Sequence, residues 1–203
     1  MHCSKEDESI SDAVSQWLLS YYKVVVLAVD EEFVSRSLQK QLTDSNNELT
    51  LDDAVKIVGC MNGLAKKTHF PGEENYFSND PQPMRRAVAF TQTIEQSKKF
   101  VAMFEEIQAL YKINTNDGRN HTVALKHVDG SFNALERKNR IEWLKQDTGE
   151  DSCRVLSNAR CLSEGVDVPA LDAVMFLNPR KSIVDIIQSV GRVMRLCEGK
   201  QYG

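Results

Sequence analysis

The stretch CRVLSNARCLSEGVDVPALDAVMFLNPRKSIVDIIQSVGRVMR, residues 153–195, decides the fold of this chain. It contains two short apolar runs, at 154–156 and 173–177, with a polar loop between them. Continuous apolar runs of this length, bounded by polar residues, are typical of strands in a parallel sheet that is buried on both faces. The stretch therefore predicts two strands, followed by a helix that begins at Ser182.

The predicted helix has two different faces. Its apolar face is formed by four residues at helical spacing, Ile183, Ile186, Ile187 and Val190. Gln188, Arg192 and Arg195 are spaced by four and three residues, so they share another face. Gly191 has no side chain and allows a close approach of a backbone or phosphate group. Two guanidinium groups and a carboxamide can bind an anion. The simpler alternative is a solvated basic helix end, because arginines also suit the helix dipole there.

Together, the loop and the helix resemble a known family. SEGVDVP at 163–169, the strand after it and QSVGRVMR at 188–195 resemble motifs V and VI of superfamily 2 helicases and translocases. The two motifs have the order and separation of that family. The Gln-led form of motif VI is similar to the DNA-directed branches, such as excision-repair helicases and the motor subunits of restriction enzymes. The resemblance implies a C-terminal, second RecA-like motor domain.

The resemblance also implies a role for each matched residue. Arg192 and Arg195 are expected to reach the γ-phosphate of ATP in a neighbouring domain, and Gln188 to position the nucleotide or the attacking water. Asp167 is expected to bind ribose hydroxyls. The full set expected at the cofactor is Glu164, Gly165, Asp167 and Gly191. The set expected to hold phosphates of one nucleic-acid strand is Thr91, Gly130, Ser157 and Asn158.

Apolar strand-like runs alternate with amphipathic helical segments along the rest of the chain. The runs at 23–30, 87–90 and 122–128 predict strands. The alternation predicts an α/β fold of three layers, a mainly parallel sheet covered by helices on both faces, and the resemblance makes it RecA-like. We expect one compact domain, with a crossing strand and a helical subfamily region in 1–83 and the helicase core, motifs IV to VI, in 84–203.

Polar residues follow several of the predicted strands. Ligands bind beyond the carboxyl ends of the strands in parallel sheets. The residues expected to converge on one edge are Thr91, Gly130, Ser131, Asn158 and Gly165. Thr93 is expected to cap the following helix. His127 is expected to be a hydrogen-bonded histidine at a strand end, because a metal or general-base role would need partners that are not evident nearby.

The sequence lacks half of a motor. It contains no GxxxxGK[ST] loop, and no Asp-Glu pair follows a strand in the manner of a magnesium site. ATP and Mg²⁺ are therefore expected to be held mainly by a first motor domain of the same polypeptide, and this chain alone is expected not to hydrolyse ATP. DNA is the expected partner, and nuclease or methyltransferase domains are candidates for fused activities.

Two alternatives remain open. One is a non-catalytic nucleic-acid-binding or regulatory module that kept a degenerate helicase fold. The other is an unrelated α/β nucleotide-binding enzyme with a fortuitous arginine helix, which predicts a glycine-rich loop that the sequence does not contain.

The composition bounds the remaining possibilities. The 203 residues are 41% hydrophobic and 27% charged, which is ordinary for a globular domain. The net charge of -4 gives no overall bias towards nucleic acid, so a polyanion would need a local basic patch. The five cysteines form no CxxC pair, which favours reduced thiols in a cytoplasmic protein. No apolar run is long enough for a membrane span, and the polar start is unlike a signal peptide.

Overall fold

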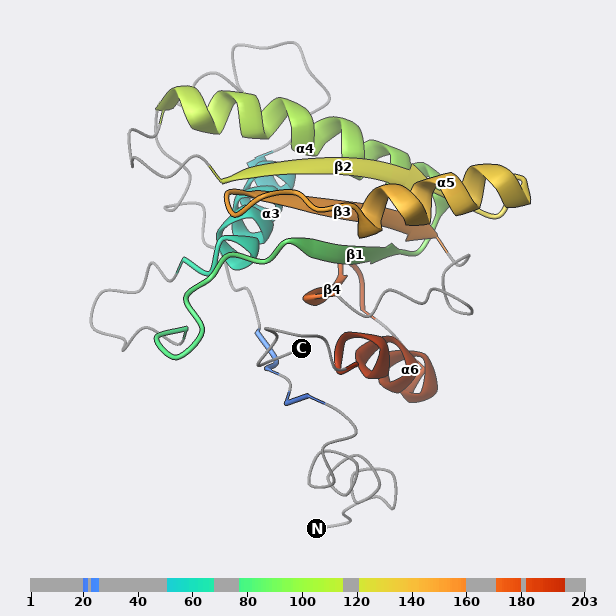
Figure 1. Cartoon of the computed structure of the whole chain (residues 1–203). Helices are drawn as coiled ribbons and strands as arrows, with labels where there is room; N and C mark the ends of the chain where they lie inside the picture. Colours follow the sequence, from blue (N-terminus) through green and yellow to red (C-terminus); the bar gives the residue numbers. More distant parts are fainter. Residues whose placement is uncertain are drawn as a thin grey trace.

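The computed structural model describes residues 20–21, 23–25, 51–67, 77–114, 121–159, 171–179 and 182–195. Four parallel strands in these residues form one sheet, in the order β2-β3-β1-β4. Figure 1 shows β1, β2 and β3 pointing in the same direction. The strand bounds are β1 Arg86–Thr91, β2 Thr122–Val128, β3 Ser152–Ala159 and β4 Ala173–Phe176. The parallel sheet expected from the sequence is confirmed.

The described residues also form four helices: α3 Leu51–Leu64, α4 Ile94–Asn114, α5 Ala134–Lys145 and α6 Ile183–Val193. Side-chain caps explain where two of them begin. The amide of Gln96 donates to Thr93 Oγ1 at 3.1 Å, so the expected cap at Thr93 is confirmed. Asn133 and Glu136 form a reciprocal capping box with two 2.9 Å bonds at the start of α5. None of the described helices is long and apolar enough to cross a lipid bilayer.

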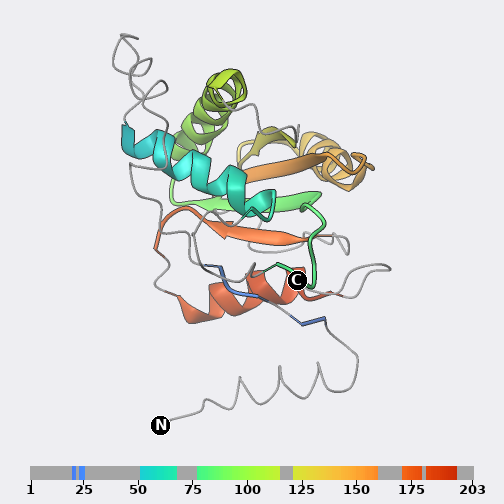
Figure 2. The same cartoon turned by 90° about the vertical axis from the view of Figure 1, so that its left-hand side faces the viewer.

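The two faces of the sheet bury separate apolar cores, which makes the fold three-layered (Figure 2). Because side chains alternate along a strand, neighbouring residues of β1 contribute to opposite cores. Ala87 and Ala89 pack with α3 and α4 on one face, and Val88 and Phe90 pack with α5 and α6 on the other. Phe104 of α4 is fully buried, and burying a side chain of this size contributes about 1.5–3 kcal/mol.

The helical region before residue 83 shares the core of the sheet. Ala54, Ile57, Val58 and Leu64 of α3 are 0–2% exposed and lie in the same cluster as β1, β2, β3 and α4. The end of α3 is then anchored by Lys66, whose ammonium group pairs with Asp80 at 2.5 Å. The helical part of the 1–83 segment therefore packs against the sheet.

The expected buried strand at 23–30 is wrong for the residues that the structure describes there. Residues 23–25 have no strand structure, and Val24 and Val25 are 69% and 40% exposed. The β-branched run predicted burial, but the described sheet ends at β2 on one side and β4 on the other, and neither edge pairs with these residues. Sequence pattern alone cannot show whether an apolar run finds a partner.

The edge strand β2 is paired by a side chain on the side away from β3. The carboxamide of Gln108, on α4, accepts from the Val123 amide at 2.7 Å and donates to the Val123 carbonyl at 3.0 Å. Gln108 is only 9% exposed, so these bonds satisfy backbone groups that would otherwise be unpaired at the edge. This clamp fixes α4 against β2.

Candidate functional site

The carboxyl ends of the strands meet at one edge of the sheet, as parallel pairing requires. Phe90 of β1 lies opposite Asn158 of β3, and Asn158 lies opposite Val128, the last residue of β2. Thr91 is the last residue of β1, and Gly130 lies two residues after the end of β2, at the same edge. The structure therefore brings together all four residues expected at nucleic-acid phosphates, including Ser157 on β3.

Thr91, Ser157 and Asn158, the three of these residues that have side chains, use them for hydrogen bonds inside the protein. Thr91 Oγ1 donates to the carbonyls of Thr93 at 3.0 Å and Asn158 at 3.1 Å, and Asn158 Nδ2 donates to the Ala89 carbonyl at 3.1 Å. Thr91 and Asn158 are 2% and 0% exposed. Their side chains join the ends of β1 and β3 and start the loop into α4. Their direct contact with phosphates stays a prediction.

Ser157 belongs to a buried chain of hydrogen bonds that the sequence did not reveal. Its Oγ lies 2.6 Å from Ser97 Oγ on α4, which lies 2.7 Å from His127 Nδ1. His127 Nε2 lies 2.7 Å from the Asp129 carboxylate, which also accepts from the amide and hydroxyl of Ser131 at 2.7 and 2.5 Å. These five side chains, the His127 network, connect β3, α4, β2 and the turn after β2.

A neutral imidazole satisfies every bond of the His127 network. Its Nε2 proton is donated to Asp129, and its Nδ1 accepts the Ser97 hydroxyl proton, which leaves Ser97 Oγ to accept from Ser157. The order carboxylate, imidazole, hydroxyl is that of a serine hydrolase triad. Ser97 is 0% exposed, however, so no substrate reaches its Oγ and the network is structural. The expected role of His127 as a hydrogen-bonded strand-end residue is confirmed.

Asp129 is the anionic end of the network. The Ser131 hydroxyl bond lowers its pKa most, burial opposes this, and the His127 and Ser131 amide bonds lower it further, to about 2. Its side chain is buried and has a partner for each oxygen. An ionised carboxylate with these bonds fixes the turn that carries Gly130.

Sequence reasoning missed Ser97, although a signal was present. Ser97, Val101, Phe104 and Gln108 recur at helical spacing and form the inward face of α4. Two polar residues on a buried helical face require buried partners. Only the tertiary structure identifies those partners as His127 and the Val123 backbone.

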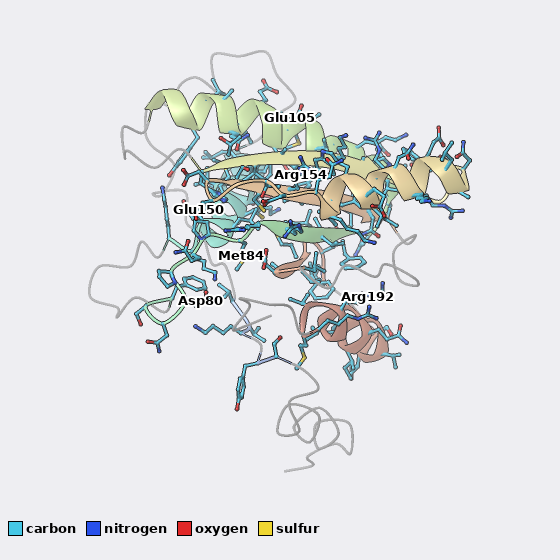
Figure 3. All side chains as sticks on the ribbon, viewed as in Figure 1. Asp80, Met84, Glu105, Glu150, Arg154 and Arg192 are labelled. Atoms are coloured by element: carbon cyan, nitrogen blue, oxygen red, sulfur yellow. The ribbon has the colours of Figure 1, made fainter. Side chains whose placement is uncertain are left out.

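The residues expected at the nucleotide lie at the end of α6. Gln188 and Arg195 are exposed, and Arg192 is half-buried (Figure 3). A Cβ added to Gly191 would meet nothing within 4 Å, so there is open space at Gly191 itself. The roles of these residues at the nucleotide stay predictions. The sequence predicted that Arg195 would share a helical face with Gln188 and Arg192. The helix ends at Val193, so Arg195 lies two residues beyond the end of α6.

Two hydrogen bonds hold the chain directly after the end of α6. The Met194 carbonyl accepts from the Ser20 amide at 2.7 Å and from the Ser20 hydroxyl at 3.0 Å. Met194 is 0% exposed and Ser20 is 5% exposed. A segment before the sheet and a segment after it therefore meet beside the two arginines.

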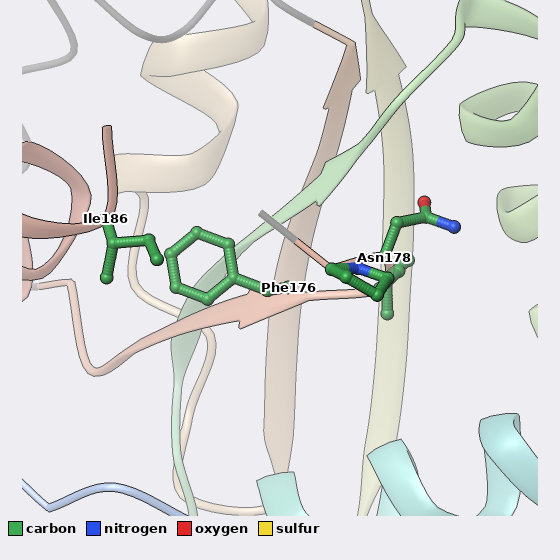
Figure 4. Close-up of a pocket in the computed structure, with 5 residues that line it drawn as sticks. Phe176, Asn178 and Ile186 are labelled. Carbon is green, nitrogen blue, oxygen red and sulfur yellow. The ribbon is translucent and has the colours of Figure 1, made fainter. Parts of the chain in front are cut away.

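An open hollow of about 320 Å³ lies between the end of β4 and α6. Figure 4 shows Phe176 and Ile186 pointing towards each other, whereas Asn178 points away. Its lining is mainly apolar: Phe176, Leu177, Asn178, Pro179 and Ile186. None of the described residues that line it has an ionisable side chain.

The described residues offer groups that suit the phosphates of ATP, but none that suit Mg²⁺. Guanidinium groups such as those of Arg192 and Arg195, neither of which is buried, have the charge and donors that a phosphate chain requires. Among the described residues no group of three His, Cys, Asp or Glu could hold a metal ion. Glu164, Gly165 and Asp167 lie outside the described residues, and their roles stay predictions.

Comparison with known proteins decides the family. The model of the helicase conserved C-terminal domain matches residues 74–197, more than half of the chain. The chain belongs to this helicase C-terminal family. Its parallel sheet, covered by helices on both faces, is the RecA-like fold expected of a second superfamily 2 motor domain.

Relatives of this helicase domain include a restriction enzyme. The solved structure "ATP-dependent Type ISP restriction-modification enzyme LlaBIII bound to DNA" is 42% identical, with a TM-score of 0.82 over 98% of this chain and 13% of that one. IRC3 of Saccharomyces cerevisiae, named as an ATP-dependent helicase, is 30% identical over 112 residues, 53% of this chain and 15% of that protein. Helicase 22 of Sulfolobus islandicus filamentous virus is 38% identical over 85 residues, 42% of this chain and 14% of that protein.

The chain thus spans no more than 15% of the length of these relatives. A motor built like them carries many further residues, and the activity of a whole protein depends on those residues as well as on this helicase domain.

Proposed function

We propose that this helicase domain is the second motor domain of an ATP-dependent DNA translocase, in which Arg192 and Arg195 complete a nucleotide site held by the first motor domain. The supporting observation is the end of α6, where neither arginine is buried and Gly191 leaves room for a phosphate group.

The chemistry follows from the guanidinium groups. ATP with its Mg²⁺ supplies a phosphoryl group whose transfer leaves charge spread over its oxygens. Arg192 and Arg195 would stabilise that charge through charge-assisted hydrogen bonds, in a cleft that excludes water. Gln188, exposed one turn before Arg192, would orient the nucleotide or the attacking water. Asp167 would bind the ribose, and Glu164 and Gly165 would link that loop to the nucleic acid.

The nucleic-acid track would run along the carboxyl ends of the strands. Gly130 is exposed, and a Cβ there would meet nothing within 4 Å. Thr91, Ser157 and Asn158 hold the neighbouring loops in place through buried bonds, so backbone groups at this edge are the better candidates for phosphate contacts. DNA is favoured over RNA because the 42% identical solved enzyme is described as bound to DNA.

The test compares arginine variants in the complete protein that contains this chain. We expect Arg192→Ala or Arg195→Ala to lower DNA-stimulated ATP turnover by about a thousandfold, the scale of an arginine finger. Arg85→Ala is the matched control. The Arg85 side chain is 41% exposed, and its ion pair with Asp147 is long, at 4.0 Å, so its removal should have little effect. A loss of about twofold in either motif VI variant, with the protein folded, would reject the proposal.

The isolated chain provides a second test. Without a phosphate-cradling loop or a described metal site, residues 1–203 alone should not turn over ATP. Turnover stimulated by DNA in this purified chain would show that the division between two motor domains is wrong. DNA binding in the complete protein without any effect of ATP would instead favour the non-catalytic module.

A further inference from the structure

Three cationic side chains gather around two aromatic rings beside the edge strand β2. Lys126 Nζ lies 4.7 Å from the centre of the Trp143 ring, and the Arg154 guanidinium lies 5.2 Å from the same ring. The Arg140 guanidinium lies 5.7 Å from the centre of the Phe132 ring. We call these five residues the Trp143 patch.

The backbone explains why these residues meet. Ala124 of β2 pairs with Arg154 of β3, and side chains alternate along β2, so Lys126 and Arg154 project from the same face of the sheet. This is the face that α5 covers, and α5 contributes Arg140 and Trp143. Arg154 Nη1 also donates to the Trp143 carbonyl and to Gln146 Oε1, which fixes its guanidinium against the end of α5.

The positive charge of the Trp143 patch is not neutralised within the described part of the chain. No carboxylate there lies within ion-pair distance of Lys126, Arg140 or Arg154. Glu142, which is on α5 as well, pairs with Lys145 at 3.5 Å. The pKa of Lys126 is lowered by burial and then by Arg140 and Arg154, so the three charges repel one another. An anion from outside would relieve this repulsion.

We propose that the Trp143 patch binds the sugar-phosphate backbone of duplex DNA, as a second contact surface beside the proposed track at the strand ends. The proposal rests on the proposed function. Phe132 follows Ser131 directly, so the patch continues from the turn that carries Gly130 along α5 to Arg154. Aromatic rings hold the three cations in place without neutralising them, which suits a row of phosphates.

The surface is separate from the proposed nucleotide site. Figure 3 shows Arg154, on β3 beneath α5, well apart from Arg192 on α6. Substitution of the cationic residues in the Trp143 patch should therefore lower the affinity for DNA. The groups that are proposed to act on ATP would remain. This separation makes the two proposals distinguishable by experiment.

The first measurement is the salt dependence of duplex DNA binding by the complete protein. The double variant Lys126→Gln, Arg140→Gln should reduce the slope of log K against log salt by about 2, because each phosphate contact contributes about 0.9. The control Lys56→Gln, Lys99→Gln removes the same charge from α3 and α4, where both ammonium groups already pair with aspartates at 2.5 and 3.7 Å. Its slope should equal that of the wild type.

A conservative variant distinguishes the effect of lost charge on the salt slope from the effect of a folding defect. Lys126→Arg, Arg140→Lys keeps both charges and should restore the wild-type slope, whereas a folding defect caused by altering these positions would persist. An unchanged slope in the glutamine variant would overturn the proposal that the Trp143 patch binds DNA. The proposed motor function would not be affected. A wild-type protein that does not bind duplex DNA would overturn both.

The second measurement identifies what lies on the patch. A photo-crosslinking side chain at position 126 should attach to the DNA backbone, and one at position 56 should not. Attachment at position 126 to an acidic segment of the protein would overturn the proposal in favour of an interdomain contact. Attachment to neither would overturn it as well.

Discussion

His127 Nε2 lies 2.7 Å from the buried carboxylate of Asp129, two residues further along the chain. The imidazole thereby connects the turn after β2 to Ser97 of α4 and, through it, to Ser157 of β3. In the proposed function, the segments that these residues connect carry the nucleic-acid track. Strand-end loops are held in one arrangement by this network, which a track for a regular phosphate backbone requires.

The Ser97–His127 bond should appear as a coupling energy. Ser97→Ala and His127→Ala each leave a buried partner unsatisfied, so the double variant should be less destabilised than the sum of the singles, by about 0.5–3 kcal/mol. Urea unfolding of the four proteins measures this. The pair Ser97→Ala and Thr148→Ala, whose positions share no bond, should be additive within about 0.5 kcal/mol. If the destabilisations of Ser97→Ala and His127→Ala simply add, the two side chains are not hydrogen-bonded as the His127 network requires.

Asp129 should make stability depend on pH in the acid range. Its pKa in the folded state is about 2, below the ordinary 3.8, so its stabilising contribution is present above the ordinary value. That contribution is lost as the pH falls through the folded value. We expect the free energy of unfolding to differ between the wild type and Asp129→Asn by about 1–3 kcal/mol near neutral pH. The difference should shrink as the pH falls from about 5 to about 2.5.

An exposed aspartate provides the control for this titration. Asp52 is 70% exposed and pairs only with Lys56 on the surface of α3. Asp52→Asn should change stability by less than about 1 kcal/mol and leave the wild-type pH profile in place. A pH profile in Asp129→Asn that is identical to the wild type would show that this carboxylate is not the titrating group.

The Gln108 clamp should protect the edge of the sheet. Gln108→Leu keeps the side-chain volume but removes both bonds to Val123, so it should cost about 1–3 kcal/mol. The amide of Val123 should also exchange with solvent hydrogen faster, because it lies at the edge away from β3. Hydrogen exchange followed by NMR measures both effects. Unchanged exchange at Val123 would show that another group pairs this edge.

Gly191→Ala should separate stability from activity. An added Cβ meets nothing within 4 Å, and alanine favours a helix over glycine, so α6 should be stabilised by about 0.5–1 kcal/mol. If a phosphate group occupies the space beside Gly191, the same methyl group should lower ATP turnover by the complete protein by about tenfold or more. Thermal unfolding and turnover assays test the two effects separately. Normal turnover would place the phosphate elsewhere.

Local pattern and the spacing of chemical groups were enough to predict most of the described fold. The apolar run at 122–128 and the capping residue Thr93 predicted β2 and the start of α4 as they occur. These features follow from backbone geometry and near-neighbour contacts, which the sequence encodes directly. The motif stretch 153–195 likewise led to the family, because its residue types and separations are distinctive.

What the sequence determined by itself was the order of strands and helices, the family and the residues at the end of α6. Only the tertiary structure decided which apolar runs are buried, as the exposed Val24 and Val25 show. It also decided which side chains meet: Ser97 with His127, and both Lys126 and Arg154 with the ring of Trp143. The physical reason is that burial and pairing depend on contacts between segments distant in the chain, whereas helical and strand periodicity arise within one segment.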